Sequence, residues 1–197
     1  MTQIETYNIA ARLTYWADQK PESVALIEMR NGQQRTFKEL EQESNRLSSG
    51  LIQFGMKPSE KVLLMVPYGI DFVTLTFAMF KAGLVPVLID PGLGKKNVLK
   101  CIKQVQPHGM IAVPLAHATK KVFPNTFKSI QHNVTVGSRW FWGGTTLNKL
   151  HCSGKADFKM AVMEKNHPAA ILFTSGSTGP AKGVLFSHNM FNHQVRI

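Results

Sequence analysis

Cysteine is scarce in this sequence, since only Cys101 and Cys152 occur among 197 residues. Two thiols this far apart are too few for a disulfide framework or a cysteine-based metal site, so we expect both to be reduced. A secretion signal is also missing, because residues 1–13 include the charged Glu5 and Arg12 instead of a continuous apolar segment. Both absences predict a cytoplasmic protein.

No apolar segment is long enough to suggest a transmembrane helix. The longest one, residues 72–89, is interrupted by Lys81, Gly83 and Pro86, which predicts a buried helix followed by a strand. The seven histidines do not form a metal-binding pattern either. Only His188 and His193 are close in sequence, and a spacing of five is poor for one helical face. We therefore expect no metal site made by the protein alone.

Acidic residues are few relative to basic ones. The sequence has 12 Asp and Glu against 23 Lys and Arg, a formal net charge of +11. A field of this sign attracts anions, and the candidates are nucleotides, acidic lipids, nucleic acids or an acidic partner. The basic side chains could equally cover a solvated face, so charge alone selects no function. The length and a hydrophobic content of 44% fit one domain or one and a half.

The first third of the chain predicts a small hairpin followed by a helix. Asn31-Gly32 is a tight-turn pair between two strand-like segments within residues 24–37. Thr36 and Glu39 have the spacing of a capping box, which predicts the start of the helix.

Strands and helices then alternate regularly. The predicted segments are strand 61–66, helix 70–81, strand 85–89, helix 95–105 and strand 110–113. This alternation predicts a parallel sheet with helical crossovers, and the apolar strands indicate that helices cover both faces of the sheet. The expected fold class is therefore α/β, with a mostly parallel sheet and a small N-terminal hairpin.

Residues 114–168 give weaker signals. We predict one more strand at 133–136, a packed turn around Trp140 and Trp142, and a surface loop at 155–166. The resulting division is an α/β subdomain at residues 1–168 and a further segment at 169–197.

The most informative stretch is residues 171–184. An apolar strand leads into a loop rich in hydroxyl groups and glycine that ends in Lys182. Small residues let backbone N–H groups approach a polyphosphate, hydroxyl groups add donors, and the lysine adds a compact positive charge. A Walker A loop is disfavoured, because Gly183 follows Lys182 where that loop has Ser or Thr. Such clusters are ordinary turns in many proteins, so the order of the residues has to decide.

The order of hydroxyls, glycines and lysine resembles the phosphate-binding signature of the adenylate-forming superfamily, which includes acyl-CoA synthetases and luciferases. The resemblance implies a loop that binds the β- and γ-phosphates of ATP, with Mg²⁺ bound to the nucleotide and Lys182 in a catalytic, charge-neutralising role. Such enzymes convert a carboxylic acid and ATP to acyl-AMP and pyrophosphate. The implied site residues are Thr174, Ser175, Gly176, Ser177, Thr178, Gly179 and Lys182.

Three further segments narrow the resemblance. Residues 88–101, 114–118 and 141–147 look like the β-lactone synthetases of bacterial olefin biosynthesis and their relatives. This implies a fatty or β-hydroxy fatty acid as the small-molecule substrate. Closure to a β-lactone, transfer to coenzyme A and transfer to a carrier protein all stay open. Ser187 is predicted to cap a helix, and His188 is expected at the surface or in a capping position, with a place near the acyl pocket as the alternative.

In this superfamily the motifs for adenine and ribose, and a C-terminal domain, lie beyond the phosphate loop. Since Ile197 falls inside a predicted helix, we expect a fragment that does not complete the reaction alone. Two other hypotheses are a non-catalytic basic module that binds nucleic acid or an anionic membrane, and a degenerate remnant of a ligase. We favour the ligase and expect no nucleic-acid partner, while peripheral membrane contact stays open.

Overall fold

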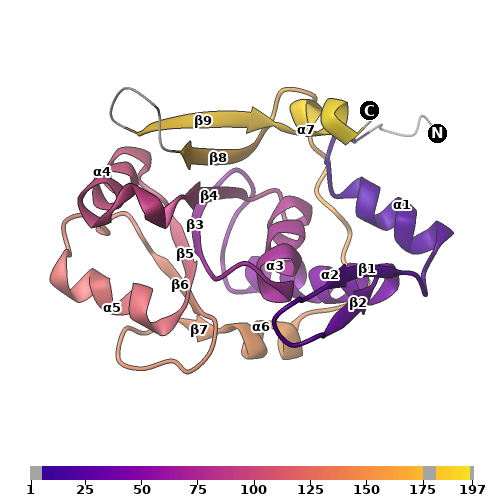
Figure 1. Cartoon of the computed structure of the whole chain (residues 1–197), viewed down its shortest axis with the longest axis horizontal. Helices are drawn as coiled ribbons and strands as arrows, with labels where there is room; N and C mark the ends of the chain where they lie inside the picture. Colours follow the sequence, from indigo (N-terminus) through magenta and orange to yellow (C-terminus); the bar gives the residue numbers. More distant parts are fainter. Residues whose placement is uncertain (1–5, 175–180, 196–197) are drawn as a thin grey trace.

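The computed structural model describes residues 6–174 and 181–195 (Figure 1). Its helices are α1 (Ala11–Gln19), α2 (Phe37–Gln53), α3 (Ile70–Lys81), the short 3₁₀ helix η1 (Pro91–Leu93), α4 (Lys95–Val105), α5 (Pro114–Val122), α6 (Leu147–Ser153) and α7 (His188–Val195). Its strands are β1 (Val24–Ile27), β2 (Gln34–Thr36), β3 (Lys61–Met65), β4 (Val85–Ile89), β5 (Gly109–Ala112), β6 (His132–Thr135), β7 (Thr145–Thr146), β8 (Pro168–Thr174) and β9 (Lys182–Ser187). Within the described ranges, no helix is long and apolar enough to cross a bilayer.

The N-terminal hairpin and the helix after it form as predicted. β1 and β2 pair antiparallel, and Thr36 at the end of β2 is the N-cap of α2. The Thr36 hydroxyl accepts a hydrogen bond from Glu39 N at 3.2 Å, and the Glu39 carboxylate accepts one from Thr36 N at 2.8 Å. The capping box is therefore complete. The bond from the Thr36 backbone holds the pKa of Glu39 below its ordinary value.

The predicted parallel sheet is confirmed. Its strand order is β7-β6-β5-β3-β4-β8-β9, and every neighbouring pair is parallel except β8 with β9. The carboxyl ends of the parallel strands consequently share one edge of the sheet, which we call the carboxyl edge. Ligands of open α/β sheets bind at this edge.

Helices cover both faces of this sheet (Figure 1). Along β3, Val62 and Leu64 pack with side chains of α2, α3 and α6, whereas Leu63 packs with those of α4. Successive residues of a strand point to opposite faces, so the strand is buried on both sides. This explains why the strands are apolar without polar alternation.

Residues 114–168 contain more regular structure than their sequence suggests. The predicted strand is β6, and residues 155–166 lack helix or strand, as expected of a loop. α5, β7 and α6 were not predicted. α5 begins with Pro114 in its first turn, a position that proline favours, so this signal could have revealed the helix. β7 has only two residues and is too short for any periodicity.

The turn at residues 140–144 is packed only in part. Trp142 is 8% exposed, whereas Trp140 and Phe141 are 60% and 66% exposed. The Trp142 indole stacks on the buried His117, with ring centroids 5.5 Å apart, and its Nε1 donates to Thr135 Oγ1 at 2.9 Å. The predicted packed turn is therefore confirmed for Trp142. Trp140 packs beside it, with ring centroids 5.4 Å apart, but most of the Trp140 side chain is exposed.

The predicted boundary at residue 168 coincides with the start of β8. β8 pairs with β4, so residues on both sides of the boundary belong to the same sheet. The division into two parts stays a prediction.

Candidate phosphate-binding site

The loop singled out in the sequence connects β8 to β9 at the carboxyl edge. The β8–β9 ladder runs up to the pair Thr174 and Lys182, which are the first and the last of the predicted site residues. Both are exposed. The remaining five lie outside the described residues: Ser175, Gly176, Ser177, Thr178 and Gly179. The fold thus brings the two ends of the predicted loop together at the ligand-binding edge of the sheet.

The end of β4 lies beside the start of the loop. β4 and β8 are in register from Ile89 to Phe173, and Asp90 N donates to Phe173 O at 3.2 Å. The Asp90 carboxylate accepts from Gly92 N at 2.8 Å and so caps η1. Asp90 therefore fixes the strand-to-helix turn that adjoins the loop, a structural role that the Asp-Pro-Gly order predicts.

The other end of the loop is held by close packing. Ala181 packs against the apolar cluster that α4 forms with the sheet. Gly183 lies opposite Phe173, and a Cβ at position 183 would be 2.7 Å from the Cζ atom of that ring. A side chain would have to displace a ring that is only 2% exposed. Glycine is therefore needed directly after Lys182, which gives a structural reason for the departure from the Walker A order.

Positive charge gathers at the same edge of the sheet. α4 begins with the exposed Lys95 and Lys96, which follow η1 directly. The amino end of a helix also carries the positive end of its dipole. With Lys182, these groups favour a negatively charged ligand at the carboxyl edge.

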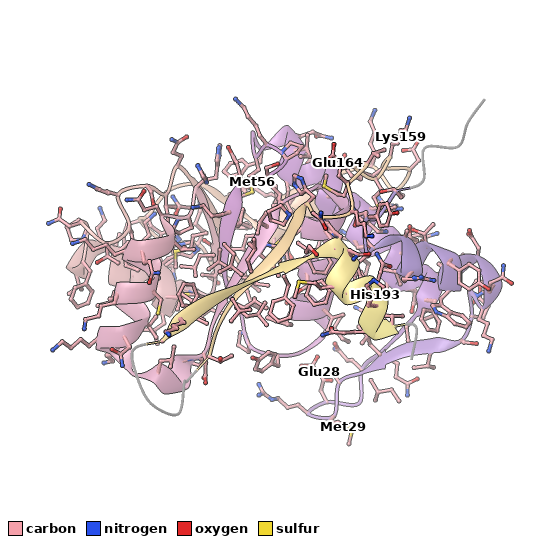
Figure 2. All side chains as sticks on the ribbon, turned by 90° about the horizontal axis from the view of Figure 1, so that it is seen from above. Glu28, Met29, Met56, Lys159, Glu164 and His193 are labelled. Atoms are coloured by element: carbon pink, nitrogen blue, oxygen red, sulfur yellow. The ribbon has the colours of Figure 1, made fainter. Side chains whose placement is uncertain are left out.

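A cavity of about 300 Å³ lies at the end of the β8–β9 hairpin that is opposite to Thr174 and Lys182. It is lined by the segment before α1, by α1 itself and by α7, with Arg12, Lys165 and His193 among its residues. Figure 2 shows His193 on α7, beyond the carboxyl end of β9. The length of β9, about 17 Å for five steps along a strand, separates this cavity from Lys182. The cavity is therefore separate from the predicted phosphate-binding loop.

His188 joins α7 to the N-terminal segment. Its Nδ1 accepts from Ile9 N at 3.2 Å, and its ring lies 5.8 Å from that of Phe80. Burial, helped by the neighbouring His167, lowers the pKa of His188 to about 4, so the ring is neutral near pH 7. The side chain is 1% exposed, which makes the expectation of a surface histidine wrong. The predicted cap is confirmed, because Ser187 Oγ accepts from Met190 N at 3.3 Å.

A family model described as AMP-binding enzyme matches residues 13–197. The chain belongs to the AMP-binding enzyme family. Members of this family are ATP-using, adenylate-forming ligases and synthetases, as the resemblance of the phosphate loop implies.

Curated relatives of this chain include the olefin beta-lactone synthetase of Stenotrophomonas maltophilia. The two are 37% identical over 201 residues, which is 96% of this chain and 36% of the relative. The chain thus spans about a third of the length of the curated relative it matches.

Solved structures of other proteins share the fold of this chain. The anthranilate CoA ligase AuaEII in complex with anthranoyl-AMP superposes with a TM-score of 0.87 and 19% identity, over 97% of this chain and 36% of that one. ATP-bound MatB from Rhodopseudomonas palustris gives a TM-score of 0.80 and 22% identity, over 97% of this chain and 37% of that one. The α/β fold is therefore that of the N-terminal part of adenylate-forming ligases.

Sequence reasoning missed two parts of the site. It predicted β4 and β8 as strands, but nothing in the sequence says that they are neighbours or that Asp90 lies beside Thr174. It also missed that Ala181 anchors the loop against α4. Both depend on the strand order, which brings together segments about 80 residues apart.

Proposed function

We propose that this chain supplies the phosphate-binding part of a ligase that activates a carboxylic acid with ATP. The observation that carries the proposal is the β8–β9 hairpin, which pairs Thr174 with Lys182 at the carboxyl edge of a parallel sheet. Its loop would hold the β- and γ-phosphates through backbone N–H groups and hydroxyls. Lys182 would offset the charge of the pyrophosphate as it leaves.

In the proposed reaction, a carboxylate oxygen of the acid attacks the α-phosphorus of ATP. The bond between the α-phosphorus and the bridging oxygen breaks, and pyrophosphate leaves with that oxygen, so the products are acyl-AMP and pyrophosphate. Catalysis of this kind depends on positioning and on stabilising negative charge. Structures that share this fold contain ATP in one case and anthranoyl-AMP in another, which supports ATP as the substrate and an acyl-AMP as the product of this step.

Magnesium is proposed to arrive with the nucleotide. Within residues 6–174 and 181–195, no group of three His, Cys, Asp or Glu could hold a metal ion. At the carboxyl edge, the Asp90 carboxylate already accepts a bond from Gly92 N. Phosphate oxygens are ligands that Mg²⁺ prefers, so ATP itself can supply them.

A fatty or β-hydroxy fatty acid is the proposed substrate. The 37% identity to an olefin beta-lactone synthetase supports this class. Ring closure to a β-lactone or thioester formation with coenzyme A would follow. Because the chain spans 36% of that relative, we propose that it does not complete the reaction alone. A cytoplasmic location is also proposed, and both cysteines are free.

A chimera tests this proposal. Residues 1–197 are joined to the remaining part of the Stenotrophomonas maltophilia synthetase, and pyrophosphate exchange is measured with a panel of fatty and β-hydroxy fatty acids. We expect acid-dependent exchange that Lys182→Ala lowers about a hundredfold or more, because a charge that faces the leaving group is lost. Lys159→Ala, a change to another exposed lysine, is the matched control and should leave the rate unchanged. Equal rates for the two variants in a folded, active chimera would refute the role of the loop.

A further inference from the structure

The excess positive charge of this protein comes from one continuous segment. Residues 91–156 contain ten Lys and Arg and no Asp or Glu, which leaves 13 basic and 12 acidic residues in all other positions. We call residues 91–156 the acid-free segment. It forms η1, α4, β5, α5, β6, β7 and α6. Of these, α4 and α5 lie on the side of the molecule away from α1 and the β1–β2 hairpin, whereas α6 lies beside α2 (Figure 1).

Large apolar side chains are exposed among these basic residues. Leu115 and Val122, seven residues apart on α5, are 79% and 69% exposed. Trp140 and Phe141 project from the loop between β6 and β7, with exposures of 60% and 66%. Residues seven apart lie on one face of a helix, so α5 presents an aliphatic stripe to solvent.

The loop that carries the two exposed rings, residues 137–144, is held in a fixed shape. Its centre is anchored by the buried Trp142, whose ring centroid lies 5.4 Å from that of Trp140 and 5.3 Å from that of Phe141. The ends of the loop are joined, since Arg139 Nη1 donates to Gly144 O at 2.6 Å. Gly144 has a φ of +79°, and a Cβ there would clash with the backbone of Asn133. The structure therefore holds Trp140 and Phe141 outward before any partner binds.

This loop adjoins α5. His117 of α5 stacks on Trp142, and the Pro114 ring lies 3.9 Å from the Cβ position at Gly137. Lys121 follows His117 by one helical turn and is exposed. The loop contacts the face of α5 that carries His117, whereas Leu115 and Val122 lie on the opposite, outward face of the same helix. Together, α5 and the loop expose the aromatic rings, the aliphatic stripe and the basic side chains.

We propose that this side, formed by α5 and residues 137–144, docks on the surface of an anionic phospholipid membrane. Aromatic side chains in the interfacial region, together with several Lys and Arg near acidic headgroups, are the combination that binds a bilayer peripherally. Single-stranded nucleic acid would also match the charge and could stack on Trp140 and Phe141. It offers nothing to Leu115 and Val122, whose exposed aliphatic groups gain free energy only in an apolar environment. The membrane therefore fits the whole surface better. This inference does not depend on the proposed ligase activity.

Vesicle binding tests the proposal with the 197-residue chain. Co-sedimentation is compared for vesicles of phosphatidylcholine alone and vesicles with about 30% phosphatidylglycerol, at low and high salt. We expect at least about tenfold stronger binding to the anionic vesicles, a blue shift of tryptophan emission, and loss of binding at high salt. Trp140→Phe should remove most of the shift, while Trp16→Phe should leave it unchanged.

Two double variants and their matched controls locate the surface. Lys121 lies on α5, and Lys128 is exposed in the segment that joins α5 to β6. Lys121→Glu with Lys128→Glu should weaken binding about tenfold or more, and the same change at the exposed Lys57 and Lys159 should have less than a twofold effect.

Trp140→Ser with Phe141→Ser should also weaken binding about tenfold. Its control is Ile27→Ser with Met29→Ser, which changes exposed apolar groups of the β1–β2 hairpin. Far-ultraviolet circular dichroism and thermal melting confirm that each variant is folded.

Three results would overturn the proposal. The first is equal or absent binding to the two vesicle types. The second is an equal loss of binding in the variants and their controls. The third is single-stranded DNA or RNA binding that is tighter than vesicle binding and is abolished by the same variants, which would assign the surface to nucleic acid instead.

Discussion

Residues 22–81 and the acid-free segment differ in whether their basic side chains form ion pairs, although both contribute strands to the seven-stranded sheet. The three ion pairs seen among the described residues all lie in the first region: Arg35 with Glu43, Lys38 with Glu22, and Lys81 with Glu41. The ten basic residues of the second region have no acidic residue within that region to pair with. Its interior is held instead by apolar packing and neutral hydrogen bonds, such as those around Trp142. Two regions that share one sheet can therefore differ in whether ion pairs or only apolar packing and neutral hydrogen bonds stabilise them.

The largest effect is expected where a charge is buried. Lys81 is 1% exposed, and its Nζ lies 2.6 Å from Glu41 Oε2 and 2.7 Å from Asn45 Oδ1. Glu41→Gln should lower the free energy of unfolding by about 3 kcal/mol, because it leaves an uncompensated charge in the core. Lys81→Met should be milder, because the Glu41 side chain is 16% exposed and its Oε1 keeps hydrogen bonds from Thr14 and Asn45. Urea unfolding measures both, and equal small losses would show that the ion pair is not what supports this region.

Low pH should reduce the stability of the fold through His188 at the start of α7. Since burial depresses the pKa of His188 from 6.5 to about 4, the unfolded chain takes up the proton first. The corresponding stability is complete above about pH 6.5 and is lost as the pH falls to about 4, up to about 3 kcal/mol. The neighbouring His167 ring also faces this group.

Urea unfolding between about pH 7.5 and pH 4.5 tests this expectation. His188→Asn keeps an acceptor for Ile9 N and should flatten the dependence. An unchanged slope in that variant would assign the acid sensitivity to other groups.

A moderate effect is expected in the acid-free segment. Trp142→Phe removes the hydrogen bond to Thr135 and part of the stacking on His117, and should destabilise the protein by about 1 to 2 kcal/mol. Trp140→Phe is the matched control and should change stability by less than about 0.5 kcal/mol, because that ring is exposed. Thermal melting separates the two. Comparable losses would mean that the loop 137–144 is packed throughout.

The smallest effect is expected for charge reversal of single exposed lysines in the two regions. Lys121→Glu relieves repulsion among unpaired basic residues and should stabilise the protein by a few tenths of a kcal/mol at low salt. Lys38→Glu has the same charge change but breaks the exposed pair with Glu22, so it should destabilise slightly. Both effects should shrink in about 1 M salt. Identical signs for the two variants would contradict the division of the molecule into paired and unpaired regions.

The accuracy of the sequence predictions varied along the chain for physical reasons. Helix 70–81, strand 85–89 and helix 95–105 have the predicted bounds, because long apolar periodicity and Gly or Pro at the ends define them locally. α5 and α6 have only nine and seven residues, and β7 is an edge strand of two residues. Such elements form mainly because the rest of the sheet supports them, so they leave little trace in the sequence.

By itself, the sequence determined the α/β class and the capping box of α2, and the residue order between Thr174 and Lys182 indicated the family. These features depend on residues close together in the chain, where local hydrogen bonds and backbone geometry act directly. Only the tertiary structure decided that β4 and β8 are neighbours, that Ala181 and Phe173 hold the loop at its base, and that Trp140 is exposed while Trp142 is buried. Contacts of that kind depend on strand order and on packing between distant segments, which local sequence patterns do not encode.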